Sequence, residues 1–274
     1  MRIFSFMLLI AAAVMLVPNE TADIVSLPIL MYHHIDEYGD DSVTISESLF
    51  EEQLEYLYEN GYNTVSLDQL VGFVENGTPL PERPVMITFD DGYESNYTIA
   101  FELLRKYGFC ASIFVVASEV GETPGSLRHF DWNEAREMVS SGHIQIASHT
   151  YDMHMSSPRC HNEFGDSLYR PDAVRRNGES RISYNNSFIA DYIKCQTLIF
   201  QNLGYFPTAF AYPHGRYSDD TESLLELLGA KITLTTDTGI NIIRRGEPES
   251  LRLLKRFNIN QQIGISELGI LLGE

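Results

Sequence analysis

A regular alternation between short apolar runs and longer amphipathic segments limits what this chain can fold into. The apolar runs have the length and composition of β-strands, and the segments between them repeat apolar residues at helical spacing. Strands that alternate with helices about seven times form parallel βα units. The pattern predicts one α/β domain, a seven-stranded (β/α) barrel that is distorted or incompletely closed. The expected strands cover residues 27–32, 63–65, 85–89, 109–116, 143–147, 206–211, 231–235 and 251–259.

The expected helices have start and stop signals in the sequence. Ser66, Asp131 and Ser218 are residue types whose side chains accept hydrogen bonds from the first turn of a helix. Gly61 and Gly229 stand where a helix should end. The predicted helices cover residues 47–60, 66–74, 93–107, 131–140, 187–202, 218–228 and 263–272.

The N-terminus has the composition of an export segment. Residues 3–17 are almost wholly apolar and follow a single positive charge at Arg2. A run of this length is shorter than the ~20 residues that a transmembrane helix needs. We therefore expect residues 1–25 to be a signal peptide or an N-terminal membrane anchor. Residues 26–274 would then form one folded domain outside the cytoplasm, secreted or held at the cell surface.

The charge and cysteine content exclude several classes of function. The net charge is −19, with 38 acidic residues against 19 basic ones, which argues against nucleic-acid binding and against docking on anionic lipid. We expect no membrane contact except through the N-terminal segment. The three cysteines, Cys110, Cys160 and Cys195, form neither a disulfide framework nor a metal motif. Cys160 and Cys195 could pair with each other, and the sequence leaves this open.

Two adjacent aspartates stand at the end of a strongly apolar strand. Residues 85–89 lead into Asp90, Asp91 and Gly92. Because successive side chains of a strand point to opposite faces, we expect the two carboxylates to point in different directions and to serve different roles, such as metal ligand and proton acceptor. A plain turn, in which Asp91 only caps the next helix, would also explain the pattern.

Three other polar clusters also follow directly on apolar strands. In a parallel barrel the C-terminal ends of the strands share one face, where active sites are built. The clusters are therefore predicted to meet in space although they are distant in sequence. They are His33-His34, residues 149–154 with a histidine at each end, and Tyr212-Pro213-His214.

The chain offers a set of donors for one divalent metal ion. Two imidazoles and one carboxylate suit Zn²⁺ and leave a position for water, although Co²⁺, Ni²⁺ or Fe²⁺ accept the same donors. His149 and His154 are five residues apart, which is about 140° around an ideal helix. The two histidines can therefore converge only from a loop.

Three motifs resemble those of the polysaccharide deacetylase family, the NodB-homology or carbohydrate esterase 4 domain. They are Thr-Phe-Asp-Asp-Gly at 88–92, Ser-His-Thr-x-x-x-His at 148–154 and Phe-Ala-Tyr-Pro-His-Gly at 210–215. The resemblance covers about residues 27–260. The spacing of the two histidines, and a strand that ends in Tyr32-His33, resemble the branch that deacetylates poly-N-acetylglucosamine exopolymers.

This resemblance implies a role for each motif residue. Asp91, His149 and His154 would hold the metal, and Asp90 would be the general base that deprotonates a metal-bound water. The backbone N–H of His214 would help to polarise the carbonyl oxygen of the acetamide. Many members of the family have tyrosine at that position.

The resemblance is less direct for the remaining site residues. Many members protonate the leaving amine with a histidine near the C-terminus, but this chain has no histidine after residue 214. The branch that supplies the acid from the first strand matches His33. Tyr212, Pro213 and Arg256 would lie at the substrate, and Arg256 either orients the base or lies at the surface.

The implied activity is metal-dependent removal of N-acetyl groups from an N-acetylglucosamine polymer or peptidoglycan, by a monomer. Glycoside hydrolysis fits poorly, because it needs carboxyl groups ~5 Å or more apart across a cleft. The sequence leaves open hydrolysis of another amide or ester on the same barrel, and also a non-catalytic protein of this family that only binds carbohydrate.

Residues 155–186 are polar and show no clear periodicity, so we expect a long loop there. It would line a polymer-binding groove or be disordered. Its candidate sugar contacts are Tyr169, Arg170, Arg175, Arg176 and Tyr184.

Overall fold

A curled parallel sheet forms the centre of the molecule. The computed structural model describes residues 23–39, 42–154 and 171–274. The sheet has the strand order β10-β9-β8-β7-β6-β2-β12, with β5 paired to β6, and every neighbouring pair is parallel. The seven strands of this path confirm the predicted curled (β/α) fold, and β5 adds an eighth strand beside β6. The strands are β2 (Ile29–Tyr32), β5 (Asn63–Thr64), β6 (Pro84–Asp91), β7 (Ala111–Val115), β8 (Ile144–Ser148), β9 (Ala209–Ala211), β10 (Ile232–Leu234) and β12 (Phe257–Asn258).

The barrel is closed by an irregular segment instead of a full strand. Leu254 makes an isolated parallel bridge to Leu234 of β10, and Phe257 of β12 pairs with Leu30 of β2. The chain between these contacts crosses the gap between the two edges of the sheet. The expected strand at 251–259 is therefore mostly wrong, because only two of its residues pair as a strand. The preceding residues form a short 3₁₀ turn, Pro248–Leu251.

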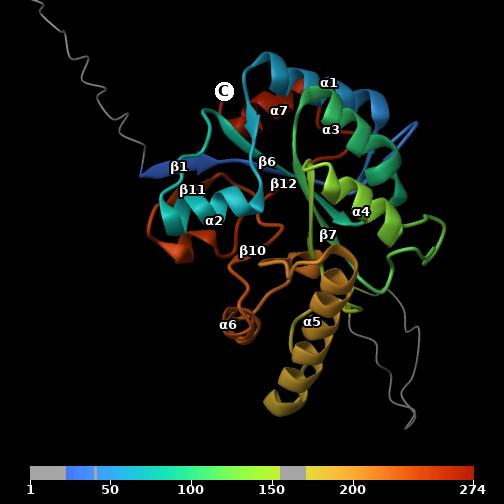
Figure 1. Cartoon of the computed structure of the whole chain (residues 1–274), viewed down its shortest axis with the longest axis vertical. Helices are drawn as coiled ribbons and strands as arrows, with labels where there is room; N and C mark the ends of the chain where they lie inside the picture. The colour runs from blue at the N-terminus through green and yellow to red at the C-terminus, as the bar shows by residue number, and fades with distance from the viewer. Residues whose placement is uncertain (1–22, 40–41, 155–170) are drawn as a thin grey trace, which may run out of the picture.

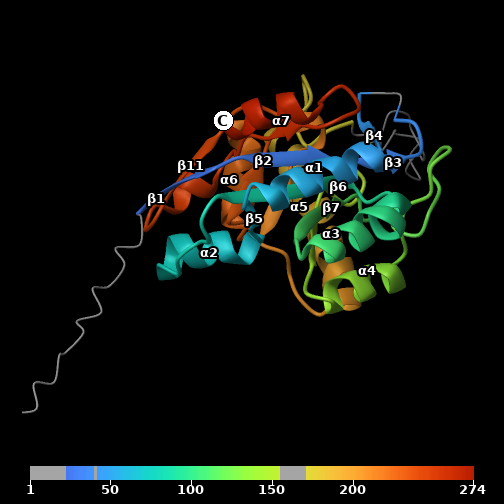
Figure 2. The same ribbon diagram turned by 90° about the horizontal axis from the view of Figure 1, so that it is seen from above.

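Helices cover the outer face of the sheet (Figures 1 and 2). Neighbouring helices contact each other, α7 with α1, α1 with α3, and α4 with α5. Both α4 and α5 also pack on β8. They are α1 (Glu47–Glu59), α2 (Leu67–Asn76), α3 (Glu102–Tyr107), α4 (Trp132–Ser140), α5 (Arg181–Leu203), α6 (Asp219–Leu227) and α7 (Ile265–Leu272).

The predicted helix starts at Ser66, Asp131 and Ser218 are confirmed. Each of these side chains accepts a hydrogen bond from a backbone N–H of the following turn. The predicted start of α5 is wrong. The helix begins after Ser180, whose hydroxyl accepts from Ser183 N, so residues 181–186 are helical.

Four strands and a π-helix do not follow from the sequence pattern. The helix expected at 93–107 begins as a π-helix, Asn96–Phe101, and continues as α3. Two small ribbons also lie outside the main sheet, one parallel and one antiparallel. Their strands are β3 (His34–Asp36) with β4 (Thr44–Ser46), and β1 (Ile24–Leu27) with β11 (Asn241–Arg244).

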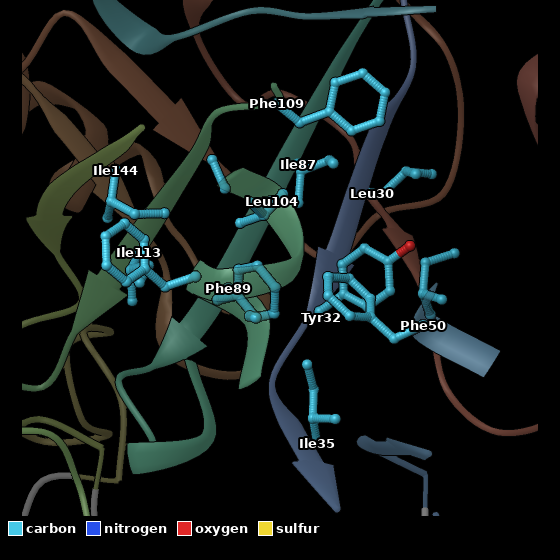
Figure 3. Packing of buried hydrophobic residues seen from close by; sticks show 14 of the residues in the cluster. Leu30, Tyr32, Ile35, Phe50, Ile87, Phe89, Leu104, Phe109, Ile113 and Ile144 are labelled. Carbon is cyan, nitrogen blue, oxygen red and sulfur yellow. The ribbon is translucent and has the colours of Figure 1, made fainter. Parts of the chain in front are cut away.

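Alternation along the strands separates two buried clusters. Odd-numbered residues of β6, such as Ile87 and Phe89, join the cluster between the sheet and its outer helices, together with Phe50 of α1 (Figure 3). Met86 belongs to the second cluster, with Phe114 of β7 and small or aliphatic residues of β8 to β10. Successive side chains of β6 thus point to opposite faces. Asp90 is four residues after Met86, so along the strand it falls on the same face of the sheet.

Some predictions fall on residues that the structure does not describe. Most of the expected signal or anchor, residues 1–22, lies outside the described ranges, as does Cys160. Within residues 23–39, 42–154 and 171–274, no helix is both long and apolar enough to span a membrane.

Candidate active site

A buried ion pair fixes the first aspartate. Asp90 and Arg256 are 2% and 0% exposed, and Arg256 donates from Nη1 and Nη2 to the two carboxylate oxygens at 2.7 Å each. Arg256 Nε also donates to Thr235 O at 2.8 Å. Burial alone would raise the pKa of Asp90, but the Arg256 guanidinium outweighs it and holds that pKa well below its usual range. Arg256 is therefore buried against Asp90 and does not lie at the surface.

The second aspartate leaves the strand in an unusual conformation. Asp91 has φ 70°, in the left-handed region, and Gly92 follows with φ 86°. This turn brings both carboxylates toward one imidazole, since His149 Nε2 lies 4.0 Å from Asp90 Oδ2 and 3.7 Å from Asp91 Oδ1. The expectation that the two aspartates point in different directions is therefore wrong. Their environments still differ, because Arg256 contacts Asp90, whereas burial raises the pKa of Asp91.

The two histidines converge from a tight loop, as their spacing requires. Their ring centroids are 4.8 Å apart, and Thr150 between them has φ 83°. His149 Nδ1 lies 2.8 Å from Ala211 O, which favours a proton on Nδ1 and leaves the Nε2 lone pair toward Asp91. Burial lowers the pKa of His149 to about 3 and also lowers that of His154. Both rings are therefore neutral at neutral pH, as a metal ligand must be.

Asp91, His149 and His154 together could hold a metal ion. One donor atom from each residue lies within 4.8 Å of the others. Asp91 Oδ1 is buried and has no hydrogen-bond partner among the residues that the structure describes, although His154 Nε2 is 3.5 Å away and His149 Nε2 is 3.7 Å away. A carboxylate oxygen aimed between two imidazole nitrogens fits a His₂Asp cation site.

His214 lies at the rim of this cluster. Its ring centroid is 4.3 Å from that of His154, and its backbone has φ 56° in the 3₁₀ turn Pro213–Gly215. The following Gly215, with φ 67°, fits closely, because a Cβ there would lie 2.7 Å from Thr236 N. The motif glycine thus shapes the turn that carries the His214 N–H.

His33 follows β2 at the same end of the sheet as the aspartates. Tyr32 of β2 pairs in register with Phe89 of β6, so the residues that come next along these neighbouring strands are His33 and Asp90. The Nδ1 of His33 is buried without a hydrogen-bond partner in the described ranges, and its backbone carbonyl accepts from Asn96 Nδ2 at 2.7 Å. The structure thus brings His33 to the same cluster, and its role as the acid stays a prediction.

Two predicted substrate residues are buried. Tyr212 is 0% exposed, and its hydroxyl donates to Glu222, which Arg252 also contacts. Burial raises the pKa of Tyr212 above its usual range. Pro213 is buried as well. A substrate contact by either side chain stays a prediction.

A cleft of about 610 Å³ opens in front of the cluster. Asp91, His154 and His214 line it together with residues that no sequence motif indicated. These additional residues come from the segment after β7, apart from the tyrosine that follows Gly92. They are Tyr93, Glu119, Pro124, Gly125, Ser126, Leu127 and His129.

The expected sugar contacts in the long loop are only partly described. Tyr184 is fully buried, and its hydroxyl donates to Ala173 O. The prediction that Tyr184 stacks on a sugar is therefore wrong. Arg175 pairs with Asp220 at the surface. Tyr169 and Arg170 lie outside the described residues.

The chain is similar to a known protein family and to several known proteins. A family model described as polysaccharide deacetylase matches residues 77–233. The chain is 31% identical over 213 residues to the Bacillus subtilis (strain 168) protein YxkH. That alignment covers 78% of this chain and 65% of YxkH. The chain is 28% identical over 232 residues to the poly-beta-1,6-N-acetyl-D-glucosamine N-deacetylase of Escherichia coli (strain K12), covering 77% of the chain and 34% of the relative. The chain thus spans less than two thirds of both curated relatives.

The fold has a close match among solved structures. A de-N-acetylase from Aggregatibacter actinomycetemcomitans superposes with a TM-score of 0.73 at 25% identity. The match covers 90% of this chain and 100% of the other.

Proposed function

The chain belongs to the polysaccharide deacetylase family, and from that premise we propose that it is a metal-dependent hydrolase that removes N-acetyl groups from a polysaccharide containing N-acetylglucosamine. The observation that carries this proposal is the adjacency of two units. One is the Asp90–Arg256 ion pair, and the other is the Asp91–His149–His154 cluster at the cleft. A carboxylate held ionised beside a cation site has the two parts that amide hydrolysis by water requires.

Asp91, His149 and His154 would hold one divalent cation, with Zn²⁺ favoured by two imidazoles and one carboxylate. When bound, the cation supplies Lewis-acid polarisation of the acetamide carbonyl and makes a water molecule more acidic. Co²⁺, Ni²⁺ and Fe²⁺ suit the same donors, so the donor set does not select one metal.

Asp90 would act as the general base. It accepts a proton from the attacking water while the water oxygen bonds to the acetyl carbon. The paired guanidinium of Arg256 keeps Asp90 ionised before the reaction and fixes both of its oxygens. The backbone N–H of His214 would donate to the carbonyl oxygen as negative charge develops there.

His33 would complete the reaction. The C–N bond breaks, and the amine leaves with a proton from the His33 imidazole, giving acetate and a glucosamine residue. The register of Tyr32 with Phe89, which places His33 at the end of the strand next to that of Asp90, supports this role.

The relatives support a substrate class. Poly-β-1,6-N-acetylglucosamine comes first because the Escherichia coli relative is named for it, and peptidoglycan is the second candidate. We propose that the chain acts as a monomer outside the cytoplasm, with residues 1–25 as its signal or anchor.

Acetate release from the metal-replete protein tests the proposal. The substrates are poly-β-1,6-N-acetylglucosamine, N-acetylglucosamine oligomers and peptidoglycan. Asp90→Asn should release acetate at least about 100-fold more slowly, because general-base catalysis contributes about 10²–10⁴-fold. A chelated sample should be slowed at least about 100-fold as well, because it lacks the Lewis acid. Asp68→Asn, the same change at an exposed position on α2, should leave release unchanged.

Undiminished release by Asp90→Asn would refute the role of the base. Undiminished release after chelation would refute metal dependence. Release from none of these polymers by a metal-binding protein would refute the substrate class and favour another amide or ester.

A further inference from the structure

The carboxylate of one α5 residue reaches the loop that joins the two histidines of the cluster. The helix is α5, which Figure 1 labels, and Asp191 stands in the middle of its residues Arg181–Leu203. Asp191 accepts from Tyr151 N through Oδ1 at 2.8 Å and from Asp152 N through Oδ2 at 2.9 Å. Both oxygens are therefore bonded to consecutive backbone N–H groups. Asp191 belongs to none of the three family motifs, and its two hydrogen bonds to Tyr151 N and Asp152 N involve no residue to which the mechanism assigns a role.

The loop needs such support because its backbone is unfavourable. Thr150 has φ 83°, in the left-handed region, which is unfavourable for a β-branched residue. Strained backbone of this kind persists only where the surroundings fix it. The carbonyls of Thr150 and Tyr151 accept from Ala117 N and Ser118 N at the end of β7, at 3.1 and 2.9 Å.

The N–H groups of the same loop are held by side-chain oxygens. Thr150 N donates to Ser148 Oγ at 3.3 Å, and Met153 N donates to Thr150 Oγ1 at 3.0 Å. These two acceptors belong to the loop and its own strand, and both are neutral. Asp191 provides the acceptor from a separate element. Burial raises the pKa of its carboxyl to about 6, so the group is mostly ionised at pH 7, and hydrogen bonds to an ionised acceptor are roughly twice as strong as neutral ones.

We propose that Asp191 is a positioning residue for the metal site. It holds Tyr151 and Asp152 so that the imidazoles of His149 and His154 face Asp91, without touching metal or substrate itself. The inference rests on the proposed function, because it presumes that the three residues bind a cation. Residues that orient metal ligands typically contribute 10–100-fold to metal affinity.

Asp191→Asn tests this inference with little change in shape. An amide has one oxygen, so it can accept from only one of the two N–H groups, and its NH₂ opposes the other. We expect the dissociation constant for Co²⁺, measured by titration of the metal-free protein, to rise by about 10–100-fold. The visible absorption of the bound Co²⁺ should change as well. The midpoint of thermal unfolding of the metal-free protein should fall by several degrees while the transition stays cooperative, because one buried N–H loses its acceptor.

The matched control is Asp220→Asn. Asp220 pairs with Arg175 and Arg181 near the start of α5, at 3.2 and 3.0 Å, so this change loosens the same helix without touching the loop. We expect its Co²⁺ affinity and spectrum to match those of the wild type. An equal loss of affinity in both variants would show that α5 as a whole is responsible, which overturns the assignment to Asp191.

The remaining outcomes separate this inference from the proposed function. Wild-type affinity in a folded Asp191→Asn protein would overturn the inference and leave the proposed function intact. Failure of the wild type to bind Co²⁺ would overturn both. If Asp191→Asn does not fold, hydrogen exchange in the wild type decides. The amides of Tyr151 and Asp152 should be protected by at least about 100-fold in the metal-free protein, and exchange at the rate of exposed amides would overturn the inference.

Discussion

Replacing Arg256 with methionine should destabilise the protein, because it leaves the buried Asp90 carboxylate without a counter-charge. The guanidinium forms two 2.7 Å hydrogen bonds to Asp90, and both side chains are buried. Methionine keeps the apolar stem but leaves a carboxylate buried without a counter-charge. Removing one partner of a buried pair costs about 3–5 kcal/mol. Coulomb's law gives about 4 kcal/mol for unit charges 4 Å apart at an effective dielectric constant of 20. We therefore expect the free energy of unfolding to fall by about 3–5 kcal/mol at pH 7.

The pair can be isolated by a double-mutant cycle in urea. Asp90→Asn, Arg256→Met and the double variant are unfolded beside the wild type. The double variant lacks the uncompensated charge, so it should be at least about 2 kcal/mol more stable than the sum of the single effects predicts. Additivity within about 0.5 kcal/mol would refute the energetic role of the ion pair.

The effect of pH on the same variants has a defined sign. The folded-state pKa of Asp90 lies below its unfolded value of 3.8, so the pair stabilises the fold above that pH. This stabilisation is lost as pH falls through the folded-state pKa. In Arg256→Met the guanidinium no longer offsets burial, so the pKa of Asp90 should rise. The stability gap between wild type and variant should therefore shrink on acidification from pH 7, and a gap that widens would contradict this explanation.

Two further substitutions test the loop that carries His214. Gly215→Ala should destabilise the protein by about 2–5 kcal/mol, because a Cβ would lie 2.7 Å from Thr236 N in addition to the positive φ. The control Gly229→Ala, with φ 89° and no atom within 4 Å of the added Cβ, should cost only about 1–2 kcal/mol. Equal losses of stability in thermal unfolding would refute the steric argument. Tyr212→Phe should cost about 1–2 kcal/mol and leave acetate release nearly unchanged, because the hydroxyl faces Glu222. A large loss of release in the folded variant would instead assign Tyr212 to the substrate.

The sequence predicted the parts of the site that depend on strand periodicity. Polar residues directly after buried strands had to meet on one face of a parallel sheet, which placed Asp91, His149 and His154 together. The five-residue spacing of the histidines also required a loop, and Thr150 with its positive φ forms it. These inferences needed only the geometry of strands and helices.

Other features depend on backbone conformation or on long-range contacts. The orientation of Asp91 results from its positive φ, which strand alternation does not anticipate. Glu119 and His129 reach the cleft from a segment without a motif, and their spacing carries no periodic signal. Arg256 follows an irregular closing segment, so only the assembled barrel shows that it enters the interior.

Irregular elements at the margins were missed for similar reasons. β1 pairs with β11, more than 200 residues away in the sequence, and neither strand has enough alternation to be recognised alone. The start of α5 was obscured by the polar residues before it, although Ser180 caps it in the usual way.

The most direct test of the central claim is a titration of metal-free protein with Co²⁺, followed by visible absorption and by acetate release from poly-β-1,6-N-acetylglucosamine in the same samples. We predict that both signals rise together and level off at about one equivalent of metal per chain, and that both are absent from a folded His149→Ala variant. Full acetate release by the metal-free protein, or an identical titration of His149→Ala, would contradict the claim that Asp91, His149 and His154 hold the metal needed for hydrolysis.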